Sequence, residues 1–438
     1  MLLITHHTGE NHGLLGPQIV ATYISEKLKI PTIVLGLKRG FKEEEFFKFL
    51  DEHYRRREKV VLFSYHCGRP DILELAEKIK TKGYRTILGG PQVEKDISGE
   101  PDLRNYPERI KGFSHIFDLG YIGPIDGMTE EILKEKRGLF YGNWRRDIEV
   151  RVEWDNLFVF GDKIEKIQVR EAQVLRSIGC PYASKKEKLL IDAPSFLFNA
   201  EPIEIECEGC SFCDVAWDKG YRGNLADEKI LEQIENLPTI NGRKIPFELI
   251  DEYPIVYLPR LLELVFTSDI NVSQINLVLR VDDILRRKQT LEHCLVEMKK
   301  RGLRLFISSV GFESFSDKIL KNLNKGVKVS ENLETIRILR ELKGKFRETV
   351  FYSRDEGAVH GFIHPTPWDD PNTIFEIQSV IGSYGLFHDI LPCHSTPLII
   401  HHGCALGEWA RKIELKYNIR FSRRVNIIEW WDYKKVFR

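Results

Sequence analysis

Short apolar segments alternate with amphipathic segments through the first third of the chain. The apolar runs are rich in β-branched residues and lack polar alternation, which is typical of strands buried on both faces. Such strands are expected at 2–4, 31–35, 60–64 and 85–88. Apolar residues at helical spacing predict helices at 17–28, 46–50, 71–80 and 128–136. Strand–helix repetition with short links predicts a parallel, doubly wound Rossmann-like sheet over residues 1–138.

Ligands of such sheets bind beyond the carboxyl ends of the strands. Those ends open here into three loops, at 6–16, 64–70 and 89–93. Gly89 and Gly90 close the strand at 85–88, where glycine admits a close ligand.

Residues 139–176 have a different pattern. The segments 149–153 and 166–170 alternate as half-exposed strands do, and Asp162 and Lys163 suit a turn between them. We interpret this segment as a connector without chemistry of its own.

A second strand–helix series occupies residues 177–400. Its strands are expected at 204–206, 247–250, 274–279 and 303–307, and its helices at 226–237, 258–266 and 291–300. About six such units fit a partial (β/α)6 TIM-type barrel, whose active site lies at the strands' carboxyl ends. Glu248, Asp251 and Arg280 stand near such ends, where a site role and a solvated or ion-paired role are equally open. Residues 401–438 are mixed and aromatic, and we expect a C-terminal extension packed on the barrel.

Composition narrows the possible functions. The 65 Lys and Arg residues balance 65 Asp and Glu residues, so the chain lacks the overall basic charge of a nucleic-acid binder. No apolar run approaches the ~20 residues that span a bilayer. The first residues do not have the pattern of a secretory signal, which predicts a cytoplasmic protein. The eight cysteines are then expected as metal ligands or free thiols rather than disulfides.

Three of these cysteines share one loop. Cys207, Cys210 and Cys213 fall within seven residues, directly after an expected strand. Thiolates are the soft ligands that metals and iron–sulfur clusters need. A second cysteine pair that would complete a four-thiolate zinc site is not nearby. If the three thiolates bind a cubane cluster, one iron stays open to a substrate or cofactor. The alternative interpretation of the loop is three free thiols.

This loop resembles part of a known family motif. Residues 210–213, Cys-Ser-Phe-Cys, resemble the latter half of the CxxxCxxC motif of radical S-adenosylmethionine (SAM) enzymes. Residues 310–326 are similar to that superfamily's G-x-E-S…L…N-K-G segment. Residues 221–223 resemble the segment that follows the family's cluster loop, and 361–365 resemble its later strand and Gly/Pro loop. The resemblance extends from about Cys180 to Leu398.

The resemblance implies a cofactor set and a reaction. Cys207, Cys210 and Cys213 would bind a [4Fe-4S] cluster, and SAM would chelate the fourth iron. An electron donor would reduce the cluster, SAM would be cleaved, and the resulting radical would abstract hydrogen from the substrate. Contacts to SAM are implied for Phe212 near the adenine and for Glu313 and Ser314 at the ribose or amino-acid part. Arg280 is a candidate partner for a carboxylate of SAM or of the substrate.

The spacing at the first cysteine departs from the family pattern by one residue. Residues 177–182, Ser-Ile-Gly-Cys-Pro-Tyr, resemble the family's approach to the first cysteine, but a charged insertion separates Cys180 from Cys210. Either Cys207 replaces the first ligand or Cys180 returns through the fold to supply it. Local loop closure favours Cys207.

The N-terminal region carries a second resemblance. Ser64 and the sequence Leu-Gly-Gly-Pro at 88–91 resemble landmarks of cobalamin (B12)-binding domains, although the Asp-x-His-x-x-Gly motif that supplies a lower ligand is missing. This architecture implies possible cobalamin-dependent C-methylation. A cobalamin-independent radical SAM enzyme (rearrangement, coupling or thiolation) and a non-enzymatic iron–sulfur protein are the alternatives. Small molecules, lipids and peptides all stay open as substrates.

Further cysteines and histidines crowd the end of the barrel series. These residues could form a second metal site. They could also be ordinary loop or core side chains, and this second interpretation is the commoner case. The candidates are Cys393, His394, His401, His402 and Cys404. Cys67 and Cys294 are interpreted as small buried apolar residues.

Overall fold

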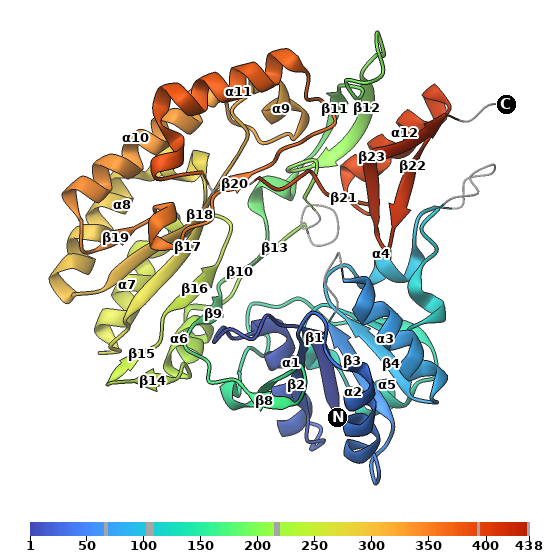
Figure 1. Ribbon diagram of the computed structural model, residues 1–438. Helices are drawn as coiled ribbons and strands as arrows, with labels where there is room; N and C mark the ends of the chain where they lie inside the picture. Colours follow the sequence, from blue (N-terminus) through green and yellow to red (C-terminus); the bar gives the residue numbers. More distant parts are fainter. Residues whose placement is uncertain (65–68, 102–108, 214–219, 392–394, 436–438) are drawn as a thin grey trace. The chain divides into compact units, whose positions relative to one another are not determined.

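The computed structural model describes residues 1–64, 69–101, 109–213, 220–391 and 395–435 (Figure 1). The chain forms two compact units. Unit 1 comprises residues 1–173, 228–238 and 423–427, and unit 2 comprises 174–227, 239–422 and 428–438. Among the described residues, no helix is long and apolar enough to cross a membrane.

Unit 1 is built on an eight-stranded sheet with the order β6-β5-β4-β3-β1-β2-β7-β8. The strands are β1 (Leu2–His6), β2 (Ile33–Leu37), β3 (Val60–Ser64), β4 (Arg85–Gly89), β5 (Leu119–Ile122), β6 (Gly138–Tyr141), β7 (Leu157–Phe160) and β8 (Ile164–Lys166). All neighbours pair in parallel except β7 and β8. The chain winds from β1 to β2 on one side and then to β3 on the other. This order confirms the predicted doubly wound fold.

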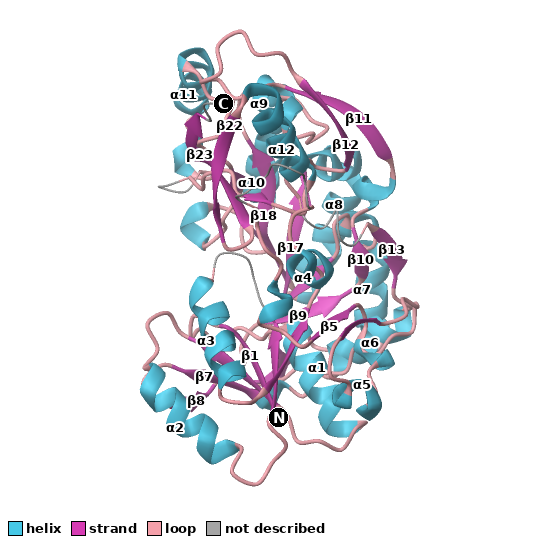
Figure 2. Cartoon of the chain, turned by 90° about the vertical axis from the view of Figure 1, so that its right-hand side faces the viewer, coloured by secondary structure: helices cyan, strands magenta, loops and turns pink. Residues whose placement is uncertain are grey.

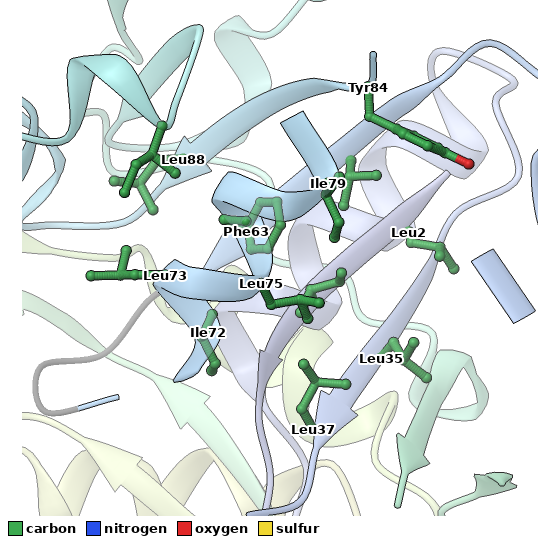
Figure 3. Close-up of a cluster of buried hydrophobic side chains, with 14 of the residues drawn as sticks. Leu2, Leu35, Leu37, Phe63, Ile72, Leu73, Leu75, Ile79, Tyr84 and Leu88 are labelled. Carbon is green, nitrogen blue, oxygen red and sulfur yellow. The ribbon is translucent and has the colours of Figure 1, made fainter. Parts of the chain in front are cut away.

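The helices of unit 1 are α1 (Leu15–Glu26), α2 (Glu43–His53), α3 (Pro70–Thr81), α4 (Val93–Ser98) and α5 (Glu130–Lys134). Figure 3 shows how side chains of α3 meet those of the sheet, with Ile72 and Leu75 among Leu37 and Phe63. Each fully buried side chain of this size contributes about 1.5–3 kcal/mol. The shared core fixes the strands so that their carboxyl ends lie along one edge.

The segment interpreted as a connector, residues 139–176, instead adds strands to this sheet. Leu157–Phe160 pairs in parallel with β2, with Val34 opposite Leu157. The continuous apolar run of β7 completes the edge that β2 would otherwise leave open. By contrast, the expected strand at 149–153 does not form, although Val150 and Val152 are buried.

Unit 2 holds a second parallel sheet with the order β19-β18-β17-β16-β9, and β20 pairs with β18. The strands are β9 (Ala172–Leu175), β16 (Phe247–Ile250), β17 (Gln274–Arg280), β18 (Arg304–Glu313), β19 (Val350–Phe351) and β20 (Gly361–Phe362). Neighbours from β16 to β20 pair in parallel. Among the described residues the sheet stays open at its edges, in agreement with the predicted partial barrel.

Helices follow the strands of this barrel (Figure 2). They are α7 (Leu258–Thr267), α8 (Val281–Arg301), α9 (Asp317–Asn322), α10 (Val329–Lys345), α11 (Pro371–Tyr384) and α12 (Ala405–Tyr417), and α6 (Asp227–Glu235) precedes them. Helix α8 packs on β17 and β18, and α10 packs on β19.

The strand before the cysteine loop lies outside the barrel sheet. β12 (Ile203–Glu208) pairs with β11 (Lys186–Ile191) in a two-stranded antiparallel hairpin, which we call the insertion hairpin. The carbonyl of Asp192, just past β11, accepts hydrogen bonds from the indoles of Trp368 and Trp409. The barrel strand of this region is β9, and β10 (Ser177–Gly179) follows it and pairs with β13 (Tyr221–Asn224).

The remaining strands form small sheets. β14 (Thr239–Ile240) and β15 (Arg243–Lys244) make a short hairpin. Near the C-terminus, β21 (Ile400–His401), β22 (Ile419–Arg424) and β23 (Ile427–Lys435) form a three-stranded sheet. Helix α12 packs against β12 of the insertion hairpin.

Candidate functional site

A pocket of about 220 Å³ lies at the carboxyl ends of the barrel strands in unit 2. This is the edge where parallel α/β folds carry their ligands. Its lining includes Cys180, Cys210, Phe212, Cys213, Glu252, Arg280, Gly311, Glu313, Lys325 and Gly361. Thiols, carboxylates and cations therefore share one small space.

Three thiols converge on this pocket from two segments of the chain. Cys180 directly follows β10, and Cys213 packs against the small cluster that Cys180 and Ala183 form. The amide of Cys213 donates to the carbonyl of Cys210 at 3.1 Å, which closes a tight turn between the two cysteines. Burial, with the charge of Glu252 adding to it, raises the pKa of Cys180 to about 11. A metal that binds here therefore displaces a thiol proton.

Cys207 is not part of this lining. It lies in β12 opposite Glu187, is 2 % exposed, and donates its thiol proton to the carbonyl of Gly209 at 3.2 Å. Burial raises the pKa of Cys207 to about 12, and the charges of Cys210 and Cys404 add to that shift. The pocket lining thus includes Cys180, Cys210 and Cys213, whereas Cys207 lies outside it.

The insertion hairpin explains how Cys180 reaches the site. Its register pairs Lys186 with Glu208 and Ile191 with Ile203, so the chain leaves after Cys180 and returns to the same place at Gly209. The hairpin satisfies its own backbone hydrogen bonds, and its closure therefore costs far less than that of a flexible loop. The entropy cost of closing a flexible loop, which favours Cys207, therefore does not apply to Cys180.

Residues 322–326 hold the cysteine loop in place. The side-chain amide of Asn324 donates to the carbonyl of Gly209 at 2.7 Å, and the hydroxyl of Ser211 donates to the carbonyl of Asn322 at 2.8 Å. The hydroxyl of Tyr182 donates to the carbonyl of Asn324 at 3.0 Å. The N-K-G segment (residues 324–326) therefore helps to hold the cysteine loop in place, a role that the sequence alone did not suggest.

Lys325 of the same segment forms an ion pair with Glu313. Its Nζ lies 2.9 Å from Oε1 of Glu313, and both side chains are buried. Burial opposes the charge of Lys325, but the neighbouring Glu313 and Cys210 outweigh it and raise the pKa of the ammonium group. Lys325 is a site residue to which sequence analysis gave no role.

Arg280, the last residue of β17, is committed to several protein groups. Its Nε donates to Asp282 at 2.9 Å, and its Nη2 donates to the carbonyl of Lys325 at 2.9 Å. Its Nη1 donates to Sγ of Cys210 at 3.5 Å, and the ring of Tyr182 lies 4.2 Å from the guanidinium carbon. The guanidinium therefore faces the cysteine loop, and little of it is left for a carboxylate of SAM or substrate.

The other predicted site residues of unit 2 are placed differently. Phe212 lines the pocket and is half-buried. Ser314 is buried outside the pocket lining, and its hydroxyl accepts a hydrogen bond from the amide of Ser316. Asp251 binds Arg176 at 2.8 Å and Ser177 at 3.1 Å, so it joins β16 to the segment that leads to Cys180. Glu248 lies within β16 and does not line the pocket.

Unit 1 presents an open glycine edge. Ser64 and Gly89 pair in register at the carboxyl ends of β3 and β4. Gly90 follows with a φ of +139°, and a Cβ added there would meet no atom within 4 Å. This edge borders β1 and β3, where the winding of the sheet reverses and where such folds bind ligands.

The predicted second metal site falls partly outside the described residues. Cys393, His394 and Cys67 belong to the segments that the structure does not describe. His401, His402 and Cys404 are buried, and Nδ1 of His401 accepts a hydrogen bond from the amide of Gly403 at 3.2 Å. A metal at this place stays a prediction. Cys294 is buried within α8.

Known proteins resemble this chain at two levels. Residues 207–353 match the model of the radical SAM superfamily. Two solved structures of the cobalamin-dependent S-adenosylmethionine radical enzyme OxsB share the fold. The one with aqua-cobalamin and S-adenosylmethionine bound has a TM-score of 0.56 at 12% identity, and the one with aqua-cobalamin bound has 0.57 at 13%. In both cases the alignment covers 98% of this chain and 63% of the OxsB chain, so this chain spans less than two thirds of that protein's length. No curated protein sequence matches.

Proposed function

Residues 207–353 form a radical SAM domain, and from this premise we propose that the chain is a radical SAM enzyme with a [4Fe-4S] cluster on Cys180, Cys210 and Cys213. The observation that carries this proposal is the convergence of these three thiols on one pocket at the strands' carboxyl ends. When bound, such a cluster supplies the single electron for the reductive cleavage of SAM.

The residues of the pocket fit these groups. Three soft thiolates suit iron and leave a fourth iron without a protein ligand, where SAM chelates the metal in this superfamily. Arg280 and Lys325 bring positive charge to a site in which thiolates concentrate negative charge. Glu313 presents a carboxylate that accepts hydrogen bonds from an amino group or from ribose hydroxyls, and Phe212 offers an aromatic face for adenine. Apolar Val278 and Leu279 also line the pocket.

Cysteine variants test the ligand set. Cys180→Ala, Cys210→Ala and Cys213→Ala should each lose most of the iron and sulfide, together with the brown absorbance, after anaerobic reconstitution. Cys207→Ala should keep them. Cys294→Ala is the matched control, because it removes another buried thiol far along α8. If Cys207→Ala loses the cluster and Cys180→Ala keeps it, Cys207 is the first ligand and the assignment is wrong.

We further propose that unit 1 binds cobalamin and that the reaction is a cobalamin-dependent methylation at carbon. The open glycine edge at Ser64, Gly89 and Gly90 and the cobalamin in the OxsB structures support this proposal. Protein expressed with ample cobalamin should contain cobalt in a stoichiometric amount alongside iron. SAM cleavage by cobalt-free protein would instead favour a cobalamin-independent radical enzyme. An iron-containing protein that cleaves no SAM with a chemical reductant would favour a non-enzymatic role.

A further inference from the structure

Arg280 points a buried positive charge at one proposed cluster ligand. Its side chain is 8 % exposed, and Nη1 donates to Sγ of Cys210 at 3.5 Å. The other N–H groups that the structure pairs go to Asp282 and to the carbonyl of Lys325. The rings of Tyr182 and Tyr253 lie 4.2 Å and 5.6 Å from the guanidinium carbon. This surrounding fixes the plane of the guanidinium, so the hydrogen bond to sulfur has a defined direction.

The charge of Arg280 is only partly compensated by its carboxylate partner. Asp282 also accepts a hydrogen bond from the hydroxyl of Tyr253 at 3.0 Å and lies 3.7 Å from Arg286. The second cation of the site, Lys325, is already paired with Glu313. Cys210 therefore receives the hydrogen bond and much of the electrostatic effect of Arg280.

We propose that Arg280 is a positioning residue that raises the reduction potential of the cluster through its hydrogen bond to Cys210. The inference rests on the proposed function, since it requires the cluster to be present. Hydrogen bonds to ligand sulfurs and the local net charge are the means by which a protein sets the potential of an iron–sulfur cluster. Reduction adds one electron, taken from an external donor that is thereby oxidised, and the guanidinium keeps its protons throughout. A fixed cation beside a thiolate stabilises the more negative, reduced form.

The experiment is a redox titration of the reconstituted holoprotein, followed by the EPR signal of the reduced cluster. Arg280→Gln should bind iron as the wild type does but should require a more negative potential for reduction. At a fixed ambient potential, its ratio of reduced to oxidised cluster should fall about tenfold, which equals 59 mV for one electron. Arg280→Lys keeps the charge without the planar fork and should lie between the two. Arg287→Gln is the matched control, because Arg287 pairs with Asp283 of the same helix rather than with Cys210.

Each outcome decides between roles. If Arg280→Gln holds a full cluster and its reduction potential equals that of the wild type, the proposal is overturned. Weakened SAM binding with an unchanged potential also overturns it and makes Arg280 an anchor for SAM. If Arg280→Gln does not assemble the cluster, the potential of Arg280→Lys must fall below the wild-type value for the proposal to stand. A wild-type protein that holds no cluster contradicts the proposed function itself, so the two failures are distinguishable.

Discussion

Lys325 and Glu313 form a buried ion pair of 2.9 Å in space that two glycines leave open. A Cβ on Gly311 would lie 2.5 Å from Nζ of Lys325, and a Cβ on Gly361 would lie 2.7 Å from Oε2 of Glu313. Glu313 itself has a φ of +59°, which is uncommon for a residue with a side chain. The carboxylate of Glu313 therefore lines the pocket. The end of β18, the two glycines and Lys325 of the N-K-G segment together hold it there.

The first prediction concerns the stability of this pair. Lys325→Met should destabilise the protein by about 3–5 kcal/mol, because it leaves the Glu313 carboxylate buried without its cation. The double variant Lys325→Met with Glu313→Gln should recover part of that loss. The measurement is the free energy of unfolding in urea. Lys300→Met breaks an exposed pair with Glu297 and should leave the free energy of unfolding almost unchanged. If Lys325→Met and Lys300→Met lowered the free energy of unfolding by the same amount, Lys325 and Glu313 would not be a buried, coupled pair.

The second prediction separates SAM binding from this structural role. The double variant should bind SAM about ten- to a hundredfold more weakly than Lys325→Met alone, because a hydrogen bond to a charged group contributes about 1.5–3 kcal/mol. Calorimetric titration of SAM into reconstituted protein measures the difference. The iron content of both variants should equal that of the wild type, since Glu313 is proposed to bind SAM and not iron. Equal SAM affinities would assign Glu313 to the support of the fold.

The fold was largely predictable from periodicity, because buried parallel strands leave continuous apolar runs. The runs at β1 to β4 and at β16 to β18 are of this kind, and each lies where it was expected. The segment 149–153 misled because alternating Val and charged residues suit an irregular, half-buried segment as well as a strand. Pairing partners are not encoded in such short patterns, so β7 was missed as a member of the sheet.

The candidate site was predictable only where its residues are close in sequence. Cys210, Phe212 and Cys213, which the sequence singled out together, all line one pocket. Cys180 is separated from them by the insertion hairpin, and nothing local shows that the chain returns after about 30 residues. The contacts of Arg280 and Lys325 likewise depend on tertiary packing, since their partners come from distant segments. The sequence left a carboxylate of SAM or substrate and a structural ion pair equally open for Arg280, and the structure pairs it with Asp282.

The third prediction concerns pH. Burial, only partly offset by Arg287, raises the pKa of Asp283 from 3.8 to about 6. A carboxyl group with a higher pKa in the folded state binds more protons there than in the unfolded state, so folding stability falls as pH rises from about 4 to 6. At 1.36 kcal/mol for each pH unit, the loss is about 3 kcal/mol.

Asp283→Asn should remove this dependence, so the difference in unfolding free energy between the variant and the wild type should change between pH 4 and 7. Asp370→Asn serves as a control of opposite sign. The Lys318 ammonium and the α11 backbone lower the pKa of Asp370 to about 2, so its contribution is lost only as pH falls below about 4. A difference for Asp283→Asn that is flat with pH would mean that its carboxyl has an ordinary pKa.

The last prediction concerns the glycine edge of unit 1. Gly90 follows β4 at the edge where doubly wound sheets bind ligands, and the space beside it is open. A valine there would project into the space that a close ligand occupies. If unit 1 binds cobalamin, Gly90→Val should lose most of its cobalt while the iron of the barrel is unchanged.

Backbone strain must be separated from this effect, because Gly90 has a φ of +139° and a β-branched side chain resists positive φ. Gly83 supplies the matched control: it precedes the same strand, has a φ of +83°, and has no atom within 4 Å of an added Cβ. Gly83→Val therefore introduces comparable strain at the opposite end of β4. Thermal unfolding of both variants is measured together with their cobalt and iron. Cobalt loss in Gly90→Val alone, with similar unfolding temperatures, supports a cobalamin site at this edge. Equal cobalt loss in both variants would trace the effect to strain in β4, and retention in both would remove Gly90 from the site.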